Sequence, residues 1–564
     1  MKLQRTDVGK LCPGLCFALS LVLSCAGQSP GPAEAARGIL EARVGGPGSA
    51  GPVFCRSDKL CGSDVLPEFY RARGFRPAWI DNRLTLETAE SLLPALRAVA
   101  EDGLNPKNYH LAALEKLLQE VREARGKKMG DVKPESLADL DMLLTDSFLL
   151  CGSHLVHGQV NPETIHSEWF IKGRHEDLVA VLEKGLEEND IPKALDSLRP
   201  SHAVYLGLKK AFREQTAVSA KGGWPAFPPG PSLKMGESDA RVEALRRILA
   251  VTGDLAPSDT EGTEFDAGLE EAVKAFQRRH GLLQDGIVGV ATAAALNIPA
   301  ARRLTQIRAN LERWRWITQD LGERYILINA ADFRVKVIER EQEVMSMPAI
   351  VGTAYRRTPE FSAKLAYIEI NPFWNVPPKL AREDILPKVG ENPDYLKEKG
   401  IRVYESWTEG APEVDPDSID WTKIEAKDLT FRFRQDPGPH NALGRIKFIF
   451  PNKFDVYIHD TPEKALFSRP SRAFSSGCVR VERPIDLAAY VLRALPEWNS
   501  ERIKQAMDSA ERRVIPLRDA LGVHLLYWTA WLDEHNRVHF REDVYGRDAA
   551  LFRALEEVAP RPDE

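Results

Sequence analysis

Two hydrophobic periodicities divide the chain. From residue 55 to residue 222 apolar side chains recur at the spacing of an α-helix, as at Leu137, Leu140 and Leu144. From residue 324 the period changes to two, which is typical of half-buried β-strands, as in Tyr325 to Asn329. We therefore expect a multidomain α+β protein, with a helical scaffold domain over 55–222 that precedes a β-rich domain.

Segments rich in Gly and Pro mark the further boundaries. The stretch 222–231 ends the first helical region, and a small helical domain over 223–300 is expected after it. A β-rich domain follows over 301–546, and residues 547–564 are expected to be a tail. Within it, Pro, Lys, Glu and Asp dominate 378–430, which predicts an inserted subdomain that could act as a lid.

The N-terminal residues 1–25 have the pattern of a secretory signal. Basic residues precede the apolar run 11–23, which is too short to span a bilayer. Val22 to Cys25 resembles a bacterial lipobox, which would leave a lipidated Cys25; simple cleavage near Ala33–Ala35 is the alternative. Residues 26–54, rich in Gly, Pro and Ala, predict a flexible tether. The expected location is the periplasm or cell envelope, with a lipid anchor in a membrane.

Charge and cysteine content exclude several function classes. A net charge of -6, from 76 basic and 82 acidic residues, gives no signature of nucleic-acid binding. In an oxidising compartment Cys55 and Cys61 could form a disulfide or remain two thiols, and Cys151 is expected in a core. No Cys-x-x-Cys pair and no His-x-x-x-His helix is predicted, so we expect neither a metal site nor a cofactor.

A basic helix with tryptophans is expected over 303–316. Such a helix could dock on a membrane or an acidic glycan, or it could join two domains with one solvated charged side. The acidic residues Glu312 and Asp320 interrupt its positive charge and favour the interdomain helix.

The segment Ser476 to Arg480 carries the strongest chemical signal. The attacking species of a cysteine is its thiolate, so Cys478 needs a neighbouring base or cation, and His459 and Arg480 are the candidates. Gly477 permits the close backbone approach that an oxyanion hole requires. The alternative is a buried structural thiol. Because His459 precedes Cys478, the order of the two residues argues against papain-like peptidases.

The small helical domain resembles the three-helix peptidoglycan-binding domain of bacterial wall enzymes, across about residues 233–298. The resemblance rests on Phe276-Gln277, the Asp285-Gly286 turn and the closing Leu296-Asn297, with Gly281-Leu282 and a Gly-x-x-Thr segment between them. Val290 stands where that family often has Pro.

Three segments of the β-rich domain resemble the L,D-transpeptidase catalytic domain. They are Asn441 to Gly444, Tyr457 to Pro462 and Ser475 to Arg480. The insertion after Asn371 to Pro377, the upstream binding module and the helical scaffold are similar to the large Gram-negative branch of that family, as are Tyr527 to Ala530 and Asp543 to Gly546.

This resemblance implies a role for each motif residue. Cys478 would attack the carbonyl of the third stem residue, His459 would handle protons, and Arg480 would brace the loop and favour negative charge. The backbone amides around Gly477 and Cys478 would hold the oxyanion. Many relatives have His at the position of Ser476, so His459 is the one well-placed base here. The candidates for substrate binding are Ser476, Tyr457, Trp374 and Asn441, although Tyr457 and Trp374 could equally be core aromatics.

The implied activity is formation of 3-3 cross-links between tetrapeptide stems, with release of D-alanine and without a cofactor. The implied partners are the stem peptides and glycan of peptidoglycan, and a carbapenem should acylate the nucleophile. Two alternatives remain open. Water could be the acceptor, which would make the protein an L,D-carboxypeptidase, or the protein could be an inactive wall-binding lipoprotein, against which intact His459 and Cys478 argue.

Overall fold

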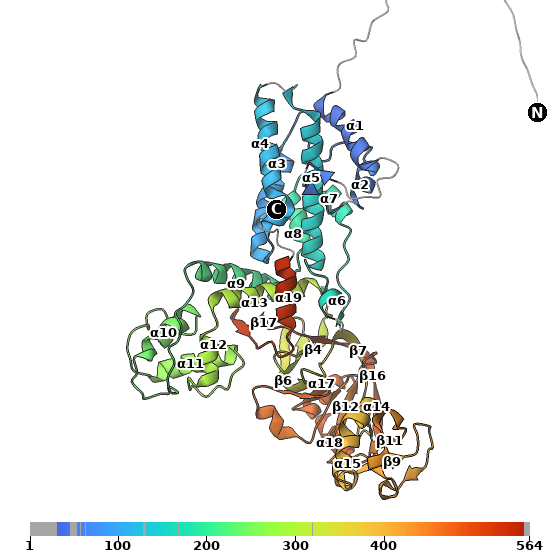
Figure 1. The fold of residues 1–564 in the computed structure, drawn as a ribbon. Coiled ribbons are helices and arrows are strands. Elements are labelled where there is room, and N and C mark those ends of the chain that lie inside the picture. The colour runs from blue at the N-terminus through green and yellow to red at the C-terminus, as the bar shows by residue number, and fades with distance from the viewer. Residues whose placement is uncertain are drawn as a thin grey trace, which may run out of the picture.

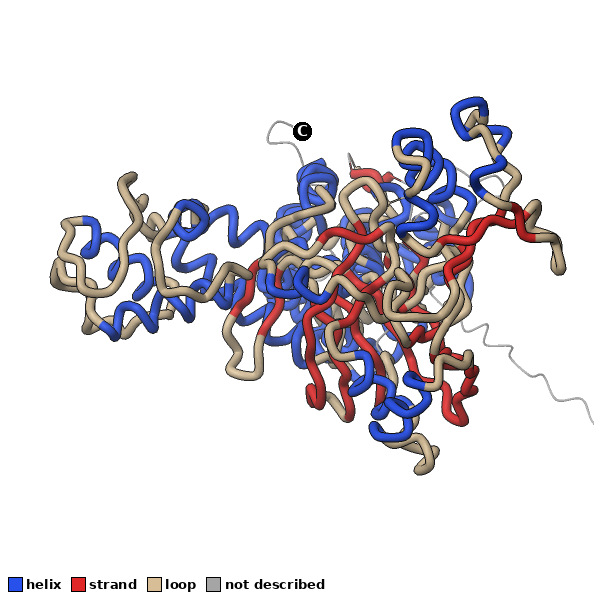
Figure 2. The backbone as a smooth tube through the Cα atoms, turned by 90° about the horizontal axis from the view of Figure 1, so that it is seen from below, coloured by secondary structure: helices blue, strands red, loops and turns tan. Residues whose placement is uncertain are grey.

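The computed structural model describes residues 31–45, 54–56, 58–62, 64–127, 131–166, 169–317 and 320–557. Figure 1 shows a helical body at one end, a smaller helical body to the side and a β-rich body at the other end. In Figure 2 the small body projects as an arm from the part that holds the strands. The fold is multidomain α+β, as predicted. Among the described helices, none is both long and apolar enough to cross a bilayer.

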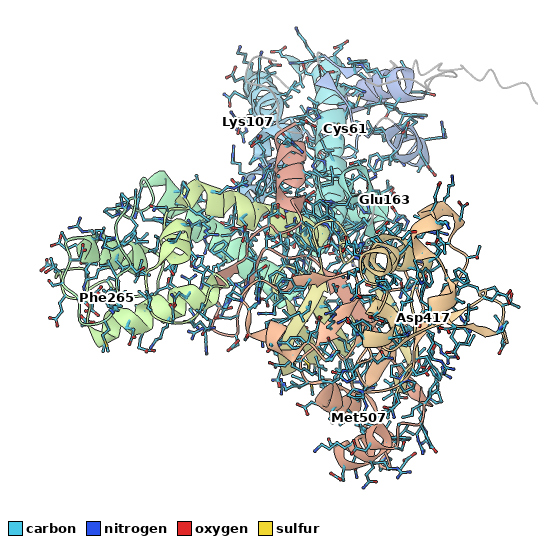
Figure 3. The ribbon with its side chains drawn as sticks, turned by 60° about the horizontal axis from the view of Figure 1, so that its bottom comes forward. Cys61, Lys107, Glu163, Phe265, Asp417 and Met507 are labelled. Atoms are coloured by element: carbon cyan, nitrogen blue, oxygen red, sulfur yellow. The ribbon has the colours of Figure 1, made fainter. Side chains whose placement is uncertain are left out.

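The scaffold domain is built around α5 (Pro134–His157), whose apolar residues are buried on all sides. A helix that is apolar all round must be surrounded by other elements, and this one supplies the centre of the first core. In Figure 3 the labelled residues Cys61 and Lys107 belong to this domain. The other scaffold helices are α1 (Pro32–Val44), α2 (Leu66–Ala72), α3 (Glu87–Ala98), α4 (Leu111–Lys127), α6 (Pro162–Ile165), α7 (Leu178–Glu188), α8 (Ile191–Ser197) and α9 (Ala203–Ala220).

Helix α1 corrects the prediction of a flexible tether over 26–54. Ala36, Leu40 and Val44 are completely buried in the scaffold core, and Arg43 forms a 2.5 Å ion pair with Asp139 of α5. Pro32, which is tolerated at the first position of a helix, and Gly38 belong to a segment with helical apolar spacing, and tertiary packing stabilises that segment as a helix. The predicted signal sequence and Cys25 lie outside the described residues.

Cys55 and Cys61 are free thiols in the structure. A short hairpin of β1 (Phe54–Cys55) and β2 (Asp58–Lys59) carries Cys55, whose Sγ lies 3.5 Å from Asp139 Oδ1. Burial raises the pKa of Cys55 to about 12, with the Asp139 carboxylate adding to the effect. The described geometry therefore favours the unpaired alternative.

Gln277 holds the small helical module together. Its amide nitrogen donates to Asp285 Oδ1 at 2.8 Å and to the Ile287 carbonyl at 2.9 Å, and its amide oxygen accepts from the Gly286 N–H at 2.9 Å. One buried side chain thus fixes the Asp-Gly turn against its helix. Figure 3 marks the core of this module by Phe265. Its helices are α10 (Arg241–Val251), α11 (Ala267–Arg279) and α12 (Val290–Leu296).

The β-rich body is a sheet that closes on itself. Its strands follow the order β12-β13-β15-β6-β5-β4-β16-β7-β3, and β12 pairs again with β7. The terminal strand β3 comes from the scaffold and pairs in parallel with β7, which joins the two bodies. The strands are β3 (Trp169–Phe170), β4 (Arg324–Asn329), β5 (Arg334–Glu339), β6 (Gln342–Gly352), β7 (Glu360–Ile370), β12 (Ile446–Ile449), β13 (Ile458–His459), β14 (Ala473–Ser475), β15 (Val479–Val481) and β16 (Arg513–Leu526).

The two faces of this sheet have different roles. Side chains such as Val335, Ile458 and Val479 point inward and form one core with helices α17 (Pro484–Val491) and α18 (Ser500–Asp508). Because successive side chains of a strand point to opposite faces, the residues between them lie on the outer face. Lys447, Tyr457, His459, Cys478 and Arg480, described below, belong to that outer face.

The insertion has a sheet and a core of its own. Its four strands are in the order β10-β9-β11-β8, so the separate unit extends from Trp374 to Gln435, beyond both ends of the predicted 378–430. Figure 3 marks it by Asp417. Its elements are β8 (Trp374–Asn375), α14 (Pro378–Leu380), a π-helical turn (Ala381–Ile385), α15 (Leu386–Glu391), α16 (Tyr395–Glu398), β9 (Ile401–Tyr404), β10 (Glu413–Val414) and β11 (Arg432–Gln435).

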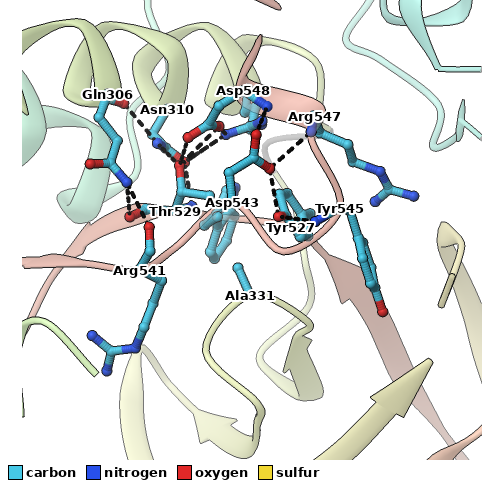
Figure 4. Close-up of polar contacts among 12 residues, drawn as sticks. Gln306, Asn310, Ala331, Tyr527, Thr529, Arg541, Asp543, Tyr545, Arg547 and Asp548 are labelled. Carbon is cyan, nitrogen blue, oxygen red and sulfur yellow. Dashed lines mark hydrogen bonds and ion pairs between the residues drawn. The ribbon is translucent and has the colours of Figure 1, made fainter. Parts of the chain in front are cut away.

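Helices α13 (Ala300–Arg315) and α19 (Arg547–Glu557) correct two further predictions. The charged side of α13 is not solvated, because Arg313 is buried and pairs with Asp548 of α19 at 2.6 Å. The predicted tail is therefore a packed helix over 547–557. Figure 4 shows the polar network between these helices and the segment from Tyr527 to Tyr545, in which Thr529 contacts Asn310 and Asp548. A hairpin of β17 (Ala530–Leu532) and β18 (Val538–Phe540) lies beside it.

Candidate active site

Two short parallel strands bring the predicted nucleophile and base together. His459 of β13 is in register with Arg480 of β15, and the Val479 N–H donates to the Tyr457 carbonyl at 3.0 Å. This register puts Tyr457 opposite Cys478. Since Ile458 and Val479 point into the core, Cys478, His459, Arg480 and Tyr457 share the outer face. Cys478 and His459 are then diagonal neighbours, whose Cα atoms are about 7–8 Å apart.

Gly477 has the backbone conformation that the motif requires. Its φ of 114° lies in a region that side chains disfavour, and a Cβ there would lie 3.5 Å from the Arg357 carbonyl. The Gly477 N–H donates to Ser475 Oγ at 3.2 Å, whereas the Cys478 N–H has no acceptor among the described residues. Of the two amides expected to hold an oxyanion, that of Cys478 is the one available in this conformation.

The Cys478 thiol is half-buried, and burial raises its pKa. The N–H and hydroxyl of Tyr457 and the cations of Lys447 and Arg480 act in the opposite direction, because each stabilises a thiolate. The Sγ atom lies 3.8 Å from the Asp455 carbonyl, and no direct hydrogen bond joins it to the imidazole in the described structure. The resting thiol is therefore mostly protonated at neutral pH and needs a base during reaction.

His459 is a neutral imidazole. Only 4% of its surface is exposed, and burial lowers its pKa to about 3, with the Arg480 cation adding to the effect. Its Nδ1 lies 2.6 Å from the Asp460 carbonyl, which can only accept, so Nδ1 carries the proton. The lone pair is then on Nε2. A neutral ring with one unprotonated nitrogen has the form that a general base requires.

Arg480 lies beside His459, with which it is in register across β13 and β15. Its Nη1 pairs with Glu463, and its Nε is buried without a partner among the described residues. The position agrees with the expectation that Arg480 braces the loop and favours negative charge on the sulfur, which stays a prediction.

Lys447 is a site residue that the sequence did not indicate. On β12 it stands opposite His459, and its Nζ lies 3.9 Å from the centroid of the Tyr457 ring. Burial lowers its pKa, while Glu369 and Cys478 act in the opposite direction. The available signal was a single lysine between the core residues Ile446 and Phe448, a pattern that also fits an ordinary solvent-facing strand position.

Ser476 connects the nucleophile loop to the insertion through Arg356. The Arg356 Nη1 donates to Ser476 Oγ at 3.1 Å, and the same guanidinium contacts Asp384 at 2.6 Å and Glu383 at 2.8 Å. Both acids belong to the π-helical turn of the insertion. The motif loop and the insertion are thus held by one side chain, which the sequence analysis did not single out.

The other substrate-binding candidates are placed differently. Tyr457 lies opposite Cys478 in the register of β13 and β15, on the same outer face as the thiol. Trp374 packs against the core of the insertion, which favours the core alternative for this residue. Asn441 is buried, and its Nδ2 donates to the carbonyls of Pro372 at 3.0 Å and Asp436 at 3.1 Å. Asn441 therefore holds the junction between insertion and sheet, and its direct contact with substrate stays a prediction.

Three stretches of the chain match models of protein families. Residues 64–212 match a scaffold domain, and residues 238–296 match the family described as "Putative peptidoglycan binding domain". Residues 323–503, which contain the site, match the L,D-transpeptidase catalytic domain of the YkuD family.

Individual relatives are similar over parts of the chain. A Haemophilus influenzae protein described as "Putative L,D-transpeptidase" is 37% identical over 226 residues, which are 40% of this chain and 45% of that protein. The N-acetylmuramoyl-L-alanine amidase CwlM of Mycobacterium tuberculosis is 41% identical over 75 residues, 12% of this chain and 18% of that protein. The chain thus spans less than half the length of the relatives it matches.

Among solved structures, an L,D-transpeptidase fragment from Xylanimonas cellulosilytica is 15% identical and covers 53% of this chain and 99% of that one. Its TM-score of 0.15 is too low to bear on this chain. The sequence matches agree with the geometry of the site: the protein carries an L,D-transpeptidase catalytic domain of the YkuD family together with a peptidoglycan-binding domain and a scaffold domain.

Proposed function

We propose that the protein is a cysteine L,D-transpeptidase that forms 3-3 cross-links between peptidoglycan stems. The observation that carries the proposal is the shared outer face of β13 and β15, on which a thiol, a neutral imidazole and an arginine lie together. The matched catalytic domain and the adjacent wall-binding module support peptidoglycan as the substrate.

In the acylation step, Nε2 of His459 takes the thiol proton, and the sulfur attacks the carbonyl carbon of the third stem residue. A C–S bond forms, and the electron pair of the C=O bond moves to oxygen. The Cys478 N–H donates to this oxyanion, while Lys447 and Arg480 stabilise the negative charge in a site of low polarity. The tetrahedral intermediate collapses, its C–N bond breaks, and D-alanine leaves with the proton from His459.

In the second step an amine of a neighbouring stem attacks the thioester. His459 takes a proton from that amine, the new C–N bond forms, and the C–S bond breaks. The thiolate of Cys478 is reprotonated by His459, which restores the resting enzyme. The low pKa of His459 leaves the resting ring unprotonated at neutral pH, and the negative charge that develops on the sulfur or the oxyanion beside it raises its affinity for a proton during the reaction.

The remaining expectations are part of the same proposal. The insertion over 374–435 acts as a lid, and its ion pairs to Arg356 support this role because they end beside Ser476. The protein works in the cell envelope, tethered by a lipid on Cys25. A carbapenem acylates Cys478 by opening of its β-lactam ring, because the strained amide carbonyl takes the place of the stem carbonyl.

Hydrolysis is the second candidate activity, since water can resolve the same thioester. Purified wild-type protein and a Cys478→Ala variant, incubated with disaccharide-tetrapeptide and analysed by mass spectrometry, separate these outcomes. We expect cross-linked dimers with wild type and none with the variant. D-alanine release without dimers would assign the carboxypeptidase, and neither product from wild type would favour an inactive wall-binding protein.

A further inference from the structure

A groove of about 790 Å³ runs between the peptidoglycan-binding module and the catalytic domain, apart from the Cys478 site. One wall is the end of the module from Arg278 to Gln284. The opposite wall is formed by β5, with Arg334 and Lys336, and by the loop from Pro470 to Arg472. Trp531 and residues of the segment that follows it also line the groove.

This groove lies on the same outer face of the sheet as the thiol. Val335 and Val337 of β5 point into the core, so Arg334 and Lys336 point outward, as Cys478 and Arg480 do. In the sheet order β15-β6-β5, the two strands are two spacings of about 4.8 Å apart. The pairing register adds an offset of four residues along β6, because Cys478 lies beside Gly352 and Arg334 lies beside Pro348, so roughly 16 Å separate Cys478 from Arg334. The loop that ends at Arg472 continues directly into β14 and the nucleophile motif.

The module is docked, so the groove has fixed walls. The Arg279 guanidinium of the module donates to the Val538 carbonyl at 2.8 Å, and the Arg541 guanidinium of the catalytic domain donates to the Arg279 carbonyl at 2.9 Å. Gly281 is required at this contact, because a Cβ would lie 2.6 Å from the Arg541 side chain. The His280 ring stacks on Phe540 with centroids 5.6 Å apart. The groove is therefore pre-formed.

Much of the charge that lines the groove is neutralised by ion pairs. Arg541 pairs with Asp332 at 2.7 Å, and Lys336 pairs with Glu343 at 2.7 Å. Arg537 pairs with Asp533 at 3.2 Å. Glu534 contacts His535, and Glu542 lines the groove without an ion pair among the described residues.

Three arginines, Arg278, Arg334 and Arg472, line the groove without a carboxylate partner in the described part of the chain. Arg334 donates to Ser346 Oγ at 2.9 Å, and Arg472 donates to the Phe333 carbonyl at 2.9 Å. Burial lowers the pKa of Arg472 to about 10. The Asp332 carboxylate acts in the opposite direction, and the nearby Arg334 and Arg541 cations add to the lowering. The wall formed by β5 and the loop thus has an excess of positive charge, which favours a carboxylate ligand.

We infer that this groove binds a carboxylate-bearing segment of a peptidoglycan strand and holds it between the module and Cys478. The inference rests on the proposed function, because it identifies how the wall polymer reaches the same site. A stem peptide ends in a carboxylate, which matches Arg334 and Arg472, and the polar lining suits the hydroxyl groups of a glycan. The fixed walls hold the strand at one distance from the nucleophile.

A binding experiment with the full chain tests the groove without turnover. In a Cys478→Ala background, we expect Arg278→Gln combined with Arg334→Gln to weaken binding of soluble, uncross-linked glycan strands with tetrapeptide stems about tenfold. Arg472 is left in place because it holds backbone carbonyls. Arg83→Gln, at an exposed scaffold position, is the matched control and should leave the affinity unchanged. Equal affinities of the double variant and the control, with unchanged melting temperatures, would overturn the inference.

A kinetic experiment separates failure of this inference from failure of the proposed function. With Cys478 present, we expect the double variant to lose about tenfold in kcat/KM on strands but less than twofold on the short disaccharide-tetrapeptide. A wild-type protein that reacts with neither substrate would overturn the proposed function. The binding experiment would then still test whether the groove binds the strand. If the wild type reacts with both the strands and the disaccharide-tetrapeptide, and the double variant has the same kcat/KM on each, only the inference about the groove would be overturned.

Discussion

The hydroxyl of Thr358 donates a 2.9 Å hydrogen bond to the carbonyl of Gly477, the residue before the nucleophile. The same hydroxyl accepts from the Gly352 N–H at 3.0 Å, and the Tyr545 hydroxyl donates to the Gly352 carbonyl at 2.8 Å. The peptide that precedes Cys478 is therefore held by residues far away in the sequence. This contact fixes the direction of the Cys478 N–H, the proposed oxyanion donor.

Replacing Thr358 with Val should lower kcat about tenfold with little change in KM. Thr358 is 1% exposed, so the substitution leaves the Gly477 carbonyl and the Gly352 N–H without their partner, which costs about 1–3 kcal/mol. Thr358→Ser keeps the hydroxyl and should stay within a factor of two. Steady-state dimer formation measures the effect, and full activity in the Val variant would show that this contact does not position the loop.

Lys447→Met should shift the pH dependence of Cys478 alkylation to higher pH. The Lys447 cation lowers the pKa of the thiol, so its removal raises that pKa and slows alkylation at pH 7. Iodoacetamide rates from pH 6 to pH 10 give the profile, with Lys504→Met at an exposed position of α18 as the control. Because the pKa of His459 is about 3, the profile should have no inflection from this imidazole near pH 6.5. A profile that is unchanged by Lys447→Met would contradict the role of this lysine.

Local patterns were enough to single out the candidate nucleophile and the candidate base. Cys478 and His459 lie in short motifs, and their meeting requires only that two neighbouring strands pair. Lys447 was missed because the alternating pattern of a strand shows that a residue points away from the core, but it does not show which residues of the neighbouring strands lie beside it. Arg356 was missed for a related reason, since its partners Asp384 and Ser476 come from segments brought together by the fold alone.

The fold shows the same limit. The helical periods of α5 and the strands were readable, whereas α1 and α19 are short helices whose stability depends on the surfaces they cover. The arginines of α13 suggested a solvated side because a helical pattern cannot show that other elements cover it. Asp548, more than two hundred residues later, supplies a compensating charge for the buried Arg313.

The link between Arg356 and Asp384 can be tested by a double-mutant cycle. We expect Arg356→Ala and Asp384→Ala each to lower kcat/KM by about three- to tenfold, because each frees the insertion from the motif loop. The kcat/KM of the double variant should be no lower than that of the less active single variant. Strictly additive losses in the cycle would mean that the two residues act independently and would remove this support for a lid.

Asp548→Ala should destabilise the protein by about 3–5 kcal/mol, because it leaves the buried Arg313 guanidinium without its partner. Asp508→Ala, at a carboxylate whose side chain is 83% exposed, should change stability by less than about 0.5 kcal/mol. Urea unfolding followed by circular dichroism measures both. Equal midpoints would show that α19 contributes little to the fold.

Intact-protein mass spectrometry shortly after mixing with disaccharide-tetrapeptide tests the central claim, the thioester on Cys478. The account predicts an adduct equal to the substrate minus D-alanine, located on the peptide that contains Cys478, and its absence from Cys478→Ala and from protein alkylated beforehand. Cross-linked products formed by Cys478→Ala, or an adduct on a different residue of the wild type, would contradict it.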